Sequence, residues 1–373
     1  MAFIVPVNSP KELKAFVDFP HALFELDKQY VPELFIAQKD LLSPGKHPFH
    51  DHSKIQLFLA YEGKKVVGRI AAIHNANHNT FNKTNEGFFG FFDVIKDYEV
   101  AKLLLDAAHD WLKEKGFDRI LGPVNFSTNE TCGLLIEGFD SPPVMMMTYN
   151  PPYYAEFLEK YGYIKHVDLW AYLIESHDFK DKSVRLLQAF EERLKSKNIT
   201  IRKVDLRQFE KEVRSIEEIY NSAWDKNLGF VPMTDDEFKY MAKDMKMILD
   251  PDFCLIAEHE GKAIGFALCI PDLNEILIKI KRGRLLPFGI FRLLFERKKI
   301  KRLRIIALGV VEGYRKLGIE ACFYGKIINS GLQKGFTSAE ASWVLENNDM
   351  MNQAVKNING KLYKKYRIYE KAA

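Results

Sequence analysis

The stretch RLRIIALGVVEGYRKLGIEACFYGKII, residues 302–328, decides the fold. Its apolar, β-branched first part, which ends at Val311, predicts a buried strand, and the part from Ile319 onward predicts a helix. Arg315-Lys316-Leu317-Gly318 lies in the turn between them and leads straight into the helix. A helix N-terminus exposes unpaired backbone N–H groups and the positive end of the helix dipole, which suits a diphosphate. Gly318 would let the backbone approach that group without a Cβ in the way.

The two halves of the chain, one of which contains this stretch, repeat one sequence pattern. LFLAYEGKKVVGRIAAI at 57–73 and FCLIAEHEGKAIGFALCI at 253–270 each predict a β-hairpin around a Glu-Gly-Lys turn. Downstream, a helical stretch ends in Lys-Gly-Phe at 115–117 and again at 334–336, where the Gly suits the C′ position of a helix. The sequence therefore predicts two successive α/β units (α+β in sheet terms), each a mixed, twisted central sheet flanked by helices.

Helix starts and length support this division. Ser9 to Glu12 and Thr234 to Glu237 are both capping-box candidates. A chain of 373 residues exceeds the usual size of a single domain. We place a linker in the polar stretch 176–185, so the expected domains are 1–178 and 179–373.

The loop before the helix resembles that of the GNAT acyltransferase superfamily, written (Gln/Arg)-x-x-Gly-x-(Gly/Ala) between a strand and a helix. Arg315 and Gly318 match that pattern, whereas Glu320 stands where a small residue is usual. The resemblance implies that this loop binds the diphosphate of acetyl-CoA or a longer acyl-CoA. The residues it assigns to that role are Arg315, Lys316, Leu317, Gly318, Ile319 and Glu320.

The continuation from 340 to 371 is similar to the next strand, helix and last strand of that superfamily. By resemblance, Leu308, Gly309 and Val310 contact the pantetheine arm, and Asn348 contacts the cofactor. Val355 stands where many members carry the tyrosine that acts as general acid. The catalytic candidates are therefore Glu340 as the base and Tyr366 as the acid; the neighbouring tyrosines are Tyr363 and Tyr369.

The first half, at 87–104, lacks an Arg-x-x-Gly between strand and helix, so we expect no CoA diphosphate there but a surface for substrate or partner. Over nearly the whole chain, strings such as PFHDHSKIQLFLA at 48–60 resemble bacterial tandem GNAT proteins that include proposed ceramide synthases. That implies transfer of an acyl group from CoA to an amine, by direct attack in a ternary complex, with a long-chain sphingoid-like base as a candidate acceptor. An aminoacyl-tRNA-dependent transferase and a non-catalytic acyl-CoA-binding module are the alternatives.

Charge is distributed unevenly along the chain. A net charge of +4 does not indicate a nucleic-acid partner, yet residues 274–304 carry eleven Lys and Arg against two Glu. That segment suits an anionic membrane surface, a phosphate of the cofactor or substrate, or a solvated face with no partner. The histidines between His47 and His78 lack metal-ligand spacing, so we expect no metal. No secretion signal or spanning run is evident, which predicts a cytoplasmic protein or one peripheral on the inner face of the membrane.

Overall fold

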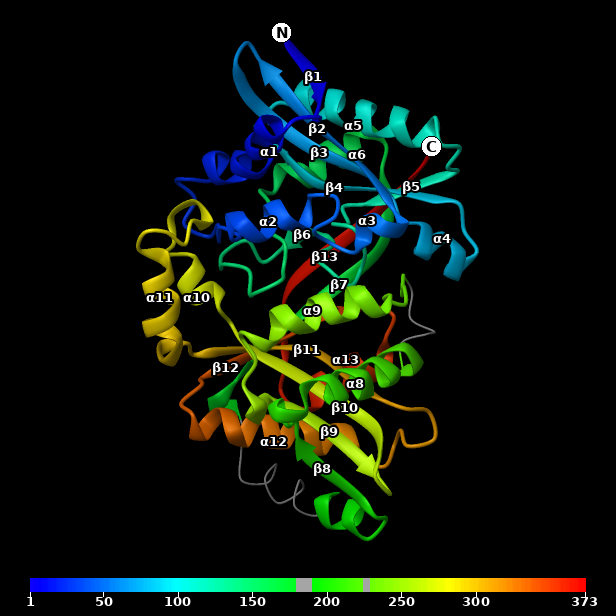
Figure 1. The fold of residues 1–373 in the computed structure, drawn as a ribbon, viewed down its shortest axis with the longest axis vertical. Helices are drawn as coiled ribbons and strands as arrows, with labels where there is room; N and C mark the ends of the chain where they lie inside the picture. The colour runs from blue at the N-terminus through cyan, green and yellow to red at the C-terminus, as the bar shows by residue number, and fades with distance from the viewer. Residues whose placement is uncertain (179–189, 224–228) are drawn as a thin grey trace. The chain divides into compact units, whose positions relative to one another are not determined.

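The computed structural model describes residues 1–178, 190–223 and 229–373, which form two compact units (Figure 1). Unit 1 comprises Met1–Trp170, Leu273–Lys298 and Lys364–Ala373, and unit 2 comprises Ala171–Asp272 and Lys299–Tyr363. The predicted α/β class is confirmed. The units divide the chain differently from the domains expected at 1–178 and 179–373, because 273–298 and 364–373 pack within unit 1. Residues 179–185 of the expected linker lie outside the described residues.

The sheet of unit 1 has the strand order β1-β2-β3-β4-β5-β13-β7. Its complete strands are β1 (Ala2–Pro6), β2 (Lys54–Glu62), β3 (Lys65–His74), β4 (Glu86–Val94), β5 (Arg119–Gly122) and β6 (Leu134–Glu137). Two further strands are divided between the units: β7 (Ile164–Glu175) belongs to unit 1 as far as Trp170, and β13 (Lys361–Ala372) belongs to it from Lys364 onward. Its helices are α1 (Pro10–Leu23), α2 (Phe35–Leu41), α3 (Phe49–His52), α4 (Ala76–Asn82), α5 (Tyr98–Lys113), α6 (Tyr153–Tyr161), α10 (Asn274–Leu277) and α11 (Gly289–Glu296). The main core forms where α5 and α6 pack against β2, β3 and β4.

The sheet of unit 2 has the strand order β7-β12-β11-β10-β9-β8. Its strands are the end of β7, β8 (Ile199–Lys203), β9 (Cys254–His259), β10 (Lys262–Pro271), β11 (Arg302–Val310), β12 (Ser338–Leu345) and the start of β13. Its helices are α8 (Phe209–Ala223), α9 (Asp235–Lys246), α12 (Ile319–Gln333) and α13 (Asp349–Asn357). Helix α8 packs over β9 and β10, and this face forms one core of the unit.

The local signals read from the sequence are confirmed. Both Glu-Gly-Lys segments turn between antiparallel strands, β2 with β3 and β9 with β10. Ser9 and Thr234 each form a complete capping box at the start of α1 and α9. Gly116 and Gly335 both adopt a left-handed conformation with φ +78°, as a C′ glycine requires.

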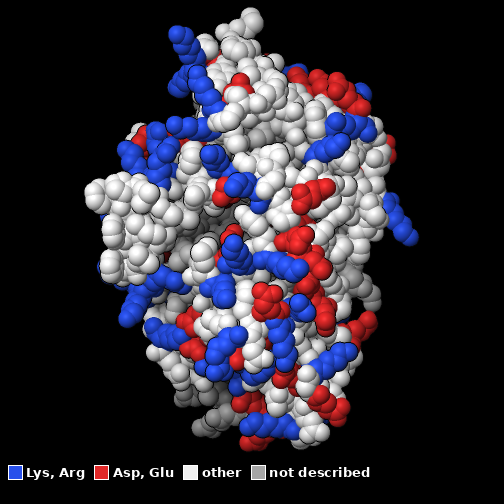
Figure 2. All heavy atoms as spheres, viewed as in Figure 1, with Lys and Arg blue, Asp and Glu red and all other residues white. Residues whose placement is uncertain are grey.

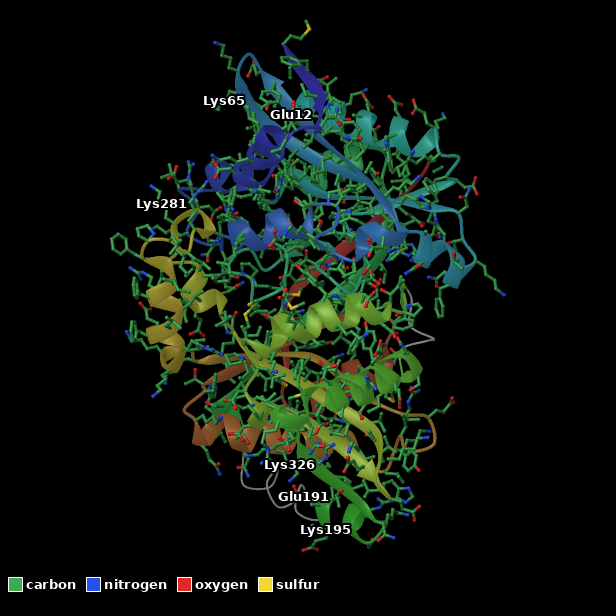
Figure 3. All side chains as sticks on the ribbon, viewed as in Figure 1. Glu12, Lys65, Glu191, Lys195, Lys281 and Lys326 are labelled. Carbon is green, nitrogen blue, oxygen red and sulfur yellow. The ribbon has the colours of Figure 1, made fainter. Side chains whose placement is uncertain are left out.

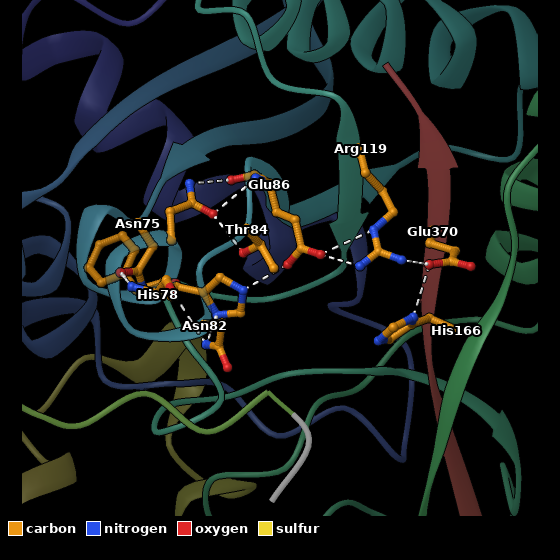
Figure 4. Close-up of polar contacts among 10 residues, drawn as sticks. Asn75, His78, Asn82, Thr84, Glu86, Arg119, His166 and Glu370 are labelled. Carbon is orange, nitrogen blue, oxygen red and sulfur yellow. Dashed lines mark hydrogen bonds and ion pairs between the residues drawn. The ribbon is translucent and has the colours of Figure 1, made fainter. Parts of the chain in front are cut away.

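A partly buried polar network joins β13 to its neighbours in the sheet of unit 1 (Figure 4). Arg119 on β5 pairs with Glu86 on β4, and its Nη1 donates to Glu370 Oε2 on β13 at 2.8 Å. His78 Nε2 lies 2.7 Å from the other oxygen of Glu86, and His166 Nδ1 lies 2.9 Å from Glu370. These mutually paired groups give the network a structural role, since each carboxylate meets a cation or a ring nitrogen.

The network predicts a specific loss of stability in acid. Burial alone would raise the pKa of Glu86, but the hydrogen bonds from His78 and Arg119 outweigh it and lower that pKa from 4.5 to about 2. A carboxyl with a lowered pKa in the folded state stabilises the fold above pH 4.5, and this contribution is lost as the pH falls toward 2. The difference in unfolding free energy between the wild type and Glu86→Gln should shrink by about 2 kcal/mol between pH 6 and pH 3. Denaturant unfolding at both pH values measures it, and an unchanged difference would contradict this role of Glu86.

Candidate active site

Two parallel strands of unit 2 separate at the centre of the sheet. The ladder between β11 and β12 runs as far as Ile305 paired with Ala341, although β11 continues to Val310 alongside β10. The pairing of β10 with β11 shifts register at the same level, so that Ile306 is an extra, bulged residue. Beyond the bulge, β11 therefore presents a backbone edge toward the gap, and this edge contains the predicted pantetheine residues Leu308, Gly309 and Val310.

The predicted diphosphate loop follows this edge directly. Two of its glycines have a left-handed backbone, Gly313 with φ +95° and Gly318 with φ +97°. Arg315 Nε donates to the carbonyl oxygen of Val310 at 3.0 Å, so this side chain ties the loop to the end of β11. Lys316 is exposed and also has a positive φ of 68°. The loop thus carries two cations beside the start of the next helix.

Helix α12 begins at this loop without a side-chain cap. Gly318 is its N-cap residue, and no side-chain oxygen accepts from the first turn. The first N–H groups of the helix thus remain donors for an anion. In the first turn, Ile319 is buried, while Leu317 and Glu320 are partly exposed.

The helical segment 190–195 packs against this helix start. A Cβ added to Gly318 would lie 2.6 Å from Phe190 Cδ1. Glu191 pairs with Lys326 of α12 at 2.8 Å, and Figure 3 labels both side chains. Because real Cβ atoms do not approach that closely, both the space and the backbone conformation require glycine at position 318.

Unit 1 differs at the corresponding helix start. The N-cap of α5 is Asp97, whose carboxylate accepts from the N–H of Glu99 at 2.9 Å. A carboxylate in this position occupies the helix donors and would repel a phosphate. The contrast between Asp97 and Gly318 is the physical difference between the two helix starts.

Asn348 lies at the start of α13 and acts as its N-cap. Its Oδ1 accepts from the N–H of Met351 at 3.1 Å, which leaves the side-chain Nδ2 as the group it can offer to a ligand. Val355 on the same helix is fully buried. The next polar residue, Asn352, binds the carbonyl oxygens of Leu345 and Glu346 and so holds the end of β12 onto α13.

Glu340 belongs to a buried polar cluster on β11, β12 and β13. Its side chain is fully buried, one carboxylate oxygen accepts from the Tyr363 hydroxyl, and the other has no hydrogen-bond partner among the described residues. Arg304 lies beside it in the β11–β12 ladder and donates from Nη2 to the carbonyl oxygen of Ser342 at 3.3 Å. A buried, half-satisfied carboxylate is costly, and such groups mark sites that a ligand completes.

Tyr366 belongs to the part of β13 in unit 1. There it is fully buried and pairs with Leu135 of β6. Within unit 2, the tyrosine that meets Glu340 is Tyr363. From the sequence, Tyr363 is named only as a neighbouring tyrosine, and Arg304 and Ser342 are not identified. The spacing of Glu340 and Ser342 could have indicated Ser342, since two residues that are two positions apart on a strand share a face.

Comparisons with known proteins find relatives over nearly the whole chain. The chain is 35% identical to the bacterial ceramide synthase of Caulobacter vibrioides, over 99% of this chain and 97% of that protein. It is also 35% identical to the protein YghO of Escherichia coli, over 96% of this chain and 93% of that protein. No protein-family model matches the chain.

Solved structures share the fold at low sequence identity. One is a tandem GNAT protein from the clavulanic acid biosynthesis pathway, with a TM-score of 0.60 and 10% identity over 100% of this chain and 98% of that one. Another is a GCN5-related N-acetyltransferase from Sphaerobacter thermophilus, with a TM-score of 0.54 and 12% identity over 99% and 95%.

The chain therefore has the fold of tandem GNAT proteins. It belongs to the family that contains the bacterial ceramide synthase of Caulobacter vibrioides and YghO of Escherichia coli.

Proposed function

We propose that the chain transfers an acyl group from acyl-CoA to an amine, and that unit 2 carries the reaction. One observation carries this proposal. Three features follow one another directly in the sequence: the β11 edge beyond Ile305, the loop 311–318, and the uncapped start of α12. This order offers backbone to the pantetheine arm and N–H groups with basic side chains to the diphosphate.

The residues present fit a CoA thioester. Arg315 to Glu320 would hold the diphosphate, Leu308 to Val310 the pantetheine, and the Nδ2 of Asn348 would donate to the arm. The carboxylate of Glu320 carries charge of the wrong sign, and we propose that it turns away from the phosphates. When bound, acyl-CoA supplies a thioester carbonyl that an acceptor amine can attack.

The chemical step requires a free amine. An ammonium has no lone pair, so a base must take its proton, and we propose Glu340 for this role through the carboxylate oxygen that lacks a partner. Backbone N–H groups at the β11 edge would polarise the carbonyl. The C–N bond forms, the C–S bond breaks, and the thiolate takes a proton. We retain Tyr366 as the sequence-based candidate for that acid, with Tyr363 as the tyrosine hydrogen-bonded to Glu340.

We propose a hydrophobic, long-chain base as the acceptor, on the strength of the 35% identity to a protein named a ceramide synthase. Unit 1 would serve as substrate or partner surface, because Asp97 caps the helix start that would otherwise face a diphosphate. The domains at 1–178 and 179–373 stay our proposal for the two evolutionary repeats.

The experiment that tests the donor is release of CoA thiol by the purified chain. We expect release to require both palmitoyl-CoA and a long-chain base such as sphinganine. Transfer that requires aminoacyl-tRNA instead would favour the tRNA-dependent alternative. Tight acyl-CoA binding without any transfer would favour a binding module.

We also propose that segment 274–304 contacts an anionic membrane surface. Of the helices that the structure describes, none combines the length and the hydrophobicity needed to cross a bilayer. Around α11, however, five large apolar side chains are between 53% and 78% exposed: Leu286, Phe288, Phe291, Leu294 and Phe295. Figure 2 shows an uncharged projection at the left edge, where α11 lies in Figure 1, with basic side chains above and below it. Apolar side chains rimmed by cations suit an interfacial membrane contact.

Part of the positive charge in this segment is already neutralised within unit 1. Lys281 pairs with Glu25 at 3.1 Å, and Arg282 and Arg284 both pair with Asp18 at 3.2 Å. The positive charge counted along the sequence therefore exceeds the charge that is available to an anionic membrane. Insertion of the apolar side chains should contribute more to the binding free energy than charge alone.

The double variant Phe288→Ser/Phe295→Ser is expected to weaken binding to phosphatidylcholine–phosphatidylglycerol vesicles at least about tenfold, since burying one Phe contributes about 1.5–3 kcal/mol. Cosedimentation of the full chain measures this. Leu26→Ser is the matched control, because Leu26 is also highly exposed in unit 1 but lies outside the segment. Equal binding by both variants would contradict a role for α11.

A further inference from the structure

An apolar pocket lies against the paired part of β11 and β12 in unit 2. It is partly open, and its volume of about 440 Å³ includes open solvent. The residues that line it are Ile174, Ser176, Leu303, Ile305, Tyr324, Ile327, Ile328, Gly331, Leu332, Phe336, Ser338, Ala339 and Ile358. All of them belong to unit 2, and all but Tyr324 and the two serines lack a polar side-chain atom.

The pocket lies against the stretch in which β11 and β12 pair, and it reaches the point where the two strands separate. Ile305, the last β11 residue paired with β12, forms part of its wall together with Leu303. Helix α12 runs antiparallel to β11 along this face: Phe323 near its start lies by Gly265 and Val310, and Gly331 near its end lies by Leu303. From Tyr324 to Leu332, the helix spans about 12 Å of the pocket.

One polar group in the wall is left unsatisfied. The Tyr324 hydroxyl is buried, and it has no hydrogen-bond partner among the described residues. Burial raises the pKa of Tyr324, so the hydroxyl stays protonated and is a donor. A buried donor without an acceptor is costly, and of the α12 residues that line the pocket Tyr324 is the nearest to the start of the helix.

We propose that this pocket holds the acyl chain of the donor, with the Tyr324 hydroxyl donating to the acyl carbonyl. A fatty-acyl thioester matches the wall in chemistry, because it has a single carbonyl oxygen at one end followed by an unbroken apolar chain. The assignment rests on the proposed use of acyl-CoA. In addition, we infer that the pocket selects long acyl chains over acetyl. The residues that make this selection would belong to α12 and β11 and not to the site of the acceptor amine.

Gly331 allows a graded test. A Cβ there would lie 3.4 Å from Leu303 Cδ1 and 3.8 Å from Phe336 Cβ, which is ordinary contact, so Gly331→Ala should fold normally. Gly331→Leu should fill the pocket. The measurement is calorimetric titration of the full chain with CoA, acetyl-CoA and octanoyl-CoA.

We expect the wild type to bind octanoyl-CoA about 100-fold more tightly than acetyl-CoA, which corresponds to burial of between three and four of its six additional methylenes at about fourfold each. Gly331→Leu should reduce that ratio to about threefold while CoA itself binds unchanged, and Gly331→Ala should keep the wild-type ratio. Tyr324→Phe should weaken both acyl-CoAs about tenfold but not CoA. If CoA binds normally and Gly331→Leu keeps the full preference for octanoyl-CoA, the pocket is not the acyl site. If the wild type does not bind CoA at all, the proposed function fails and this assignment fails with it.

Discussion

Replacing Glu340 with Gln is expected to lower kcat for acyl transfer by about 10²- to 10³-fold while CoA binds as before. The amide keeps the size of the buried side chain but cannot take a proton from the acceptor. The carboxylate is fully buried, and one of its oxygens has no partner among the described residues. The measurement is steady-state thiol release with saturating acyl-CoA and amine, alongside titration with CoA.

Two further variants test whether Glu340 acts as the base. Tyr363→Phe removes the hydroxyl that binds Glu340 but keeps the carboxylate, so we expect a smaller loss of about tenfold. Glu210→Gln changes an exposed carboxylate on α8 and should leave kcat unchanged. If Glu340→Gln retains more than a third of the wild-type kcat, Glu340 is not the base.

Replacing Gly318 with Trp should weaken CoA binding by at least about 100-fold, because the side chain would collide with Phe190 and displace the loop and the start of α12. Even the smaller change Gly318→Ala places a Cβ 2.6 Å from Phe190 Cδ1. Loss of a charge-assisted contact between phosphate and helix start adds to that steric effect. Titration with CoA measures the affinity.

Gly313→Ala is the matched control for Gly318→Ala. Both glycines have nearly the same left-handed φ, +95° and +97°, so the added methyl strains the backbone about equally at either site. Only position 318 is crowded, since no atom lies within 4 Å of a Cβ at Gly313. Equal effects of the two variants on CoA affinity would show that backbone strain, rather than the collision with Phe190 at the helix start, explains the loss.

Local chemistry made the framework predictable from the sequence. The hairpin at 253–270, the capping box at Thr234 and the C′ glycine Gly335 each depend on a few adjacent residues, and the structure has all three. The turn at Gly318 was predictable for the same reason, because a strand, a glycine and a helix follow one another without a gap.

The contacts that cross the sheet were not predictable. The hydrogen bond from Tyr363 to Glu340 joins β13 to β12 across β7, which lies between them in the sheet, and local pattern does not fix the registers of these strands. The ion pairs of Arg282 and Arg284 with Asp18 join residues more than 260 positions apart, so charge counted along the segment could not include them. Exposure of Phe288 and Phe295 likewise follows from packing, because periodicity alone does not show which apolar face lacks a neighbour.

The measurement that tests the central claim most directly is mass-spectrometric analysis of the product from isotope-labelled palmitoyl-CoA and a long-chain base. We expect a labelled amide of the base and an equal amount of free CoA thiol. The Glu340→Gln and Gly318→Trp variants should lose this amide product. Labelled free fatty acid without amide, or an amide yield unaffected by both variants, would contradict N-acyl transfer by unit 2.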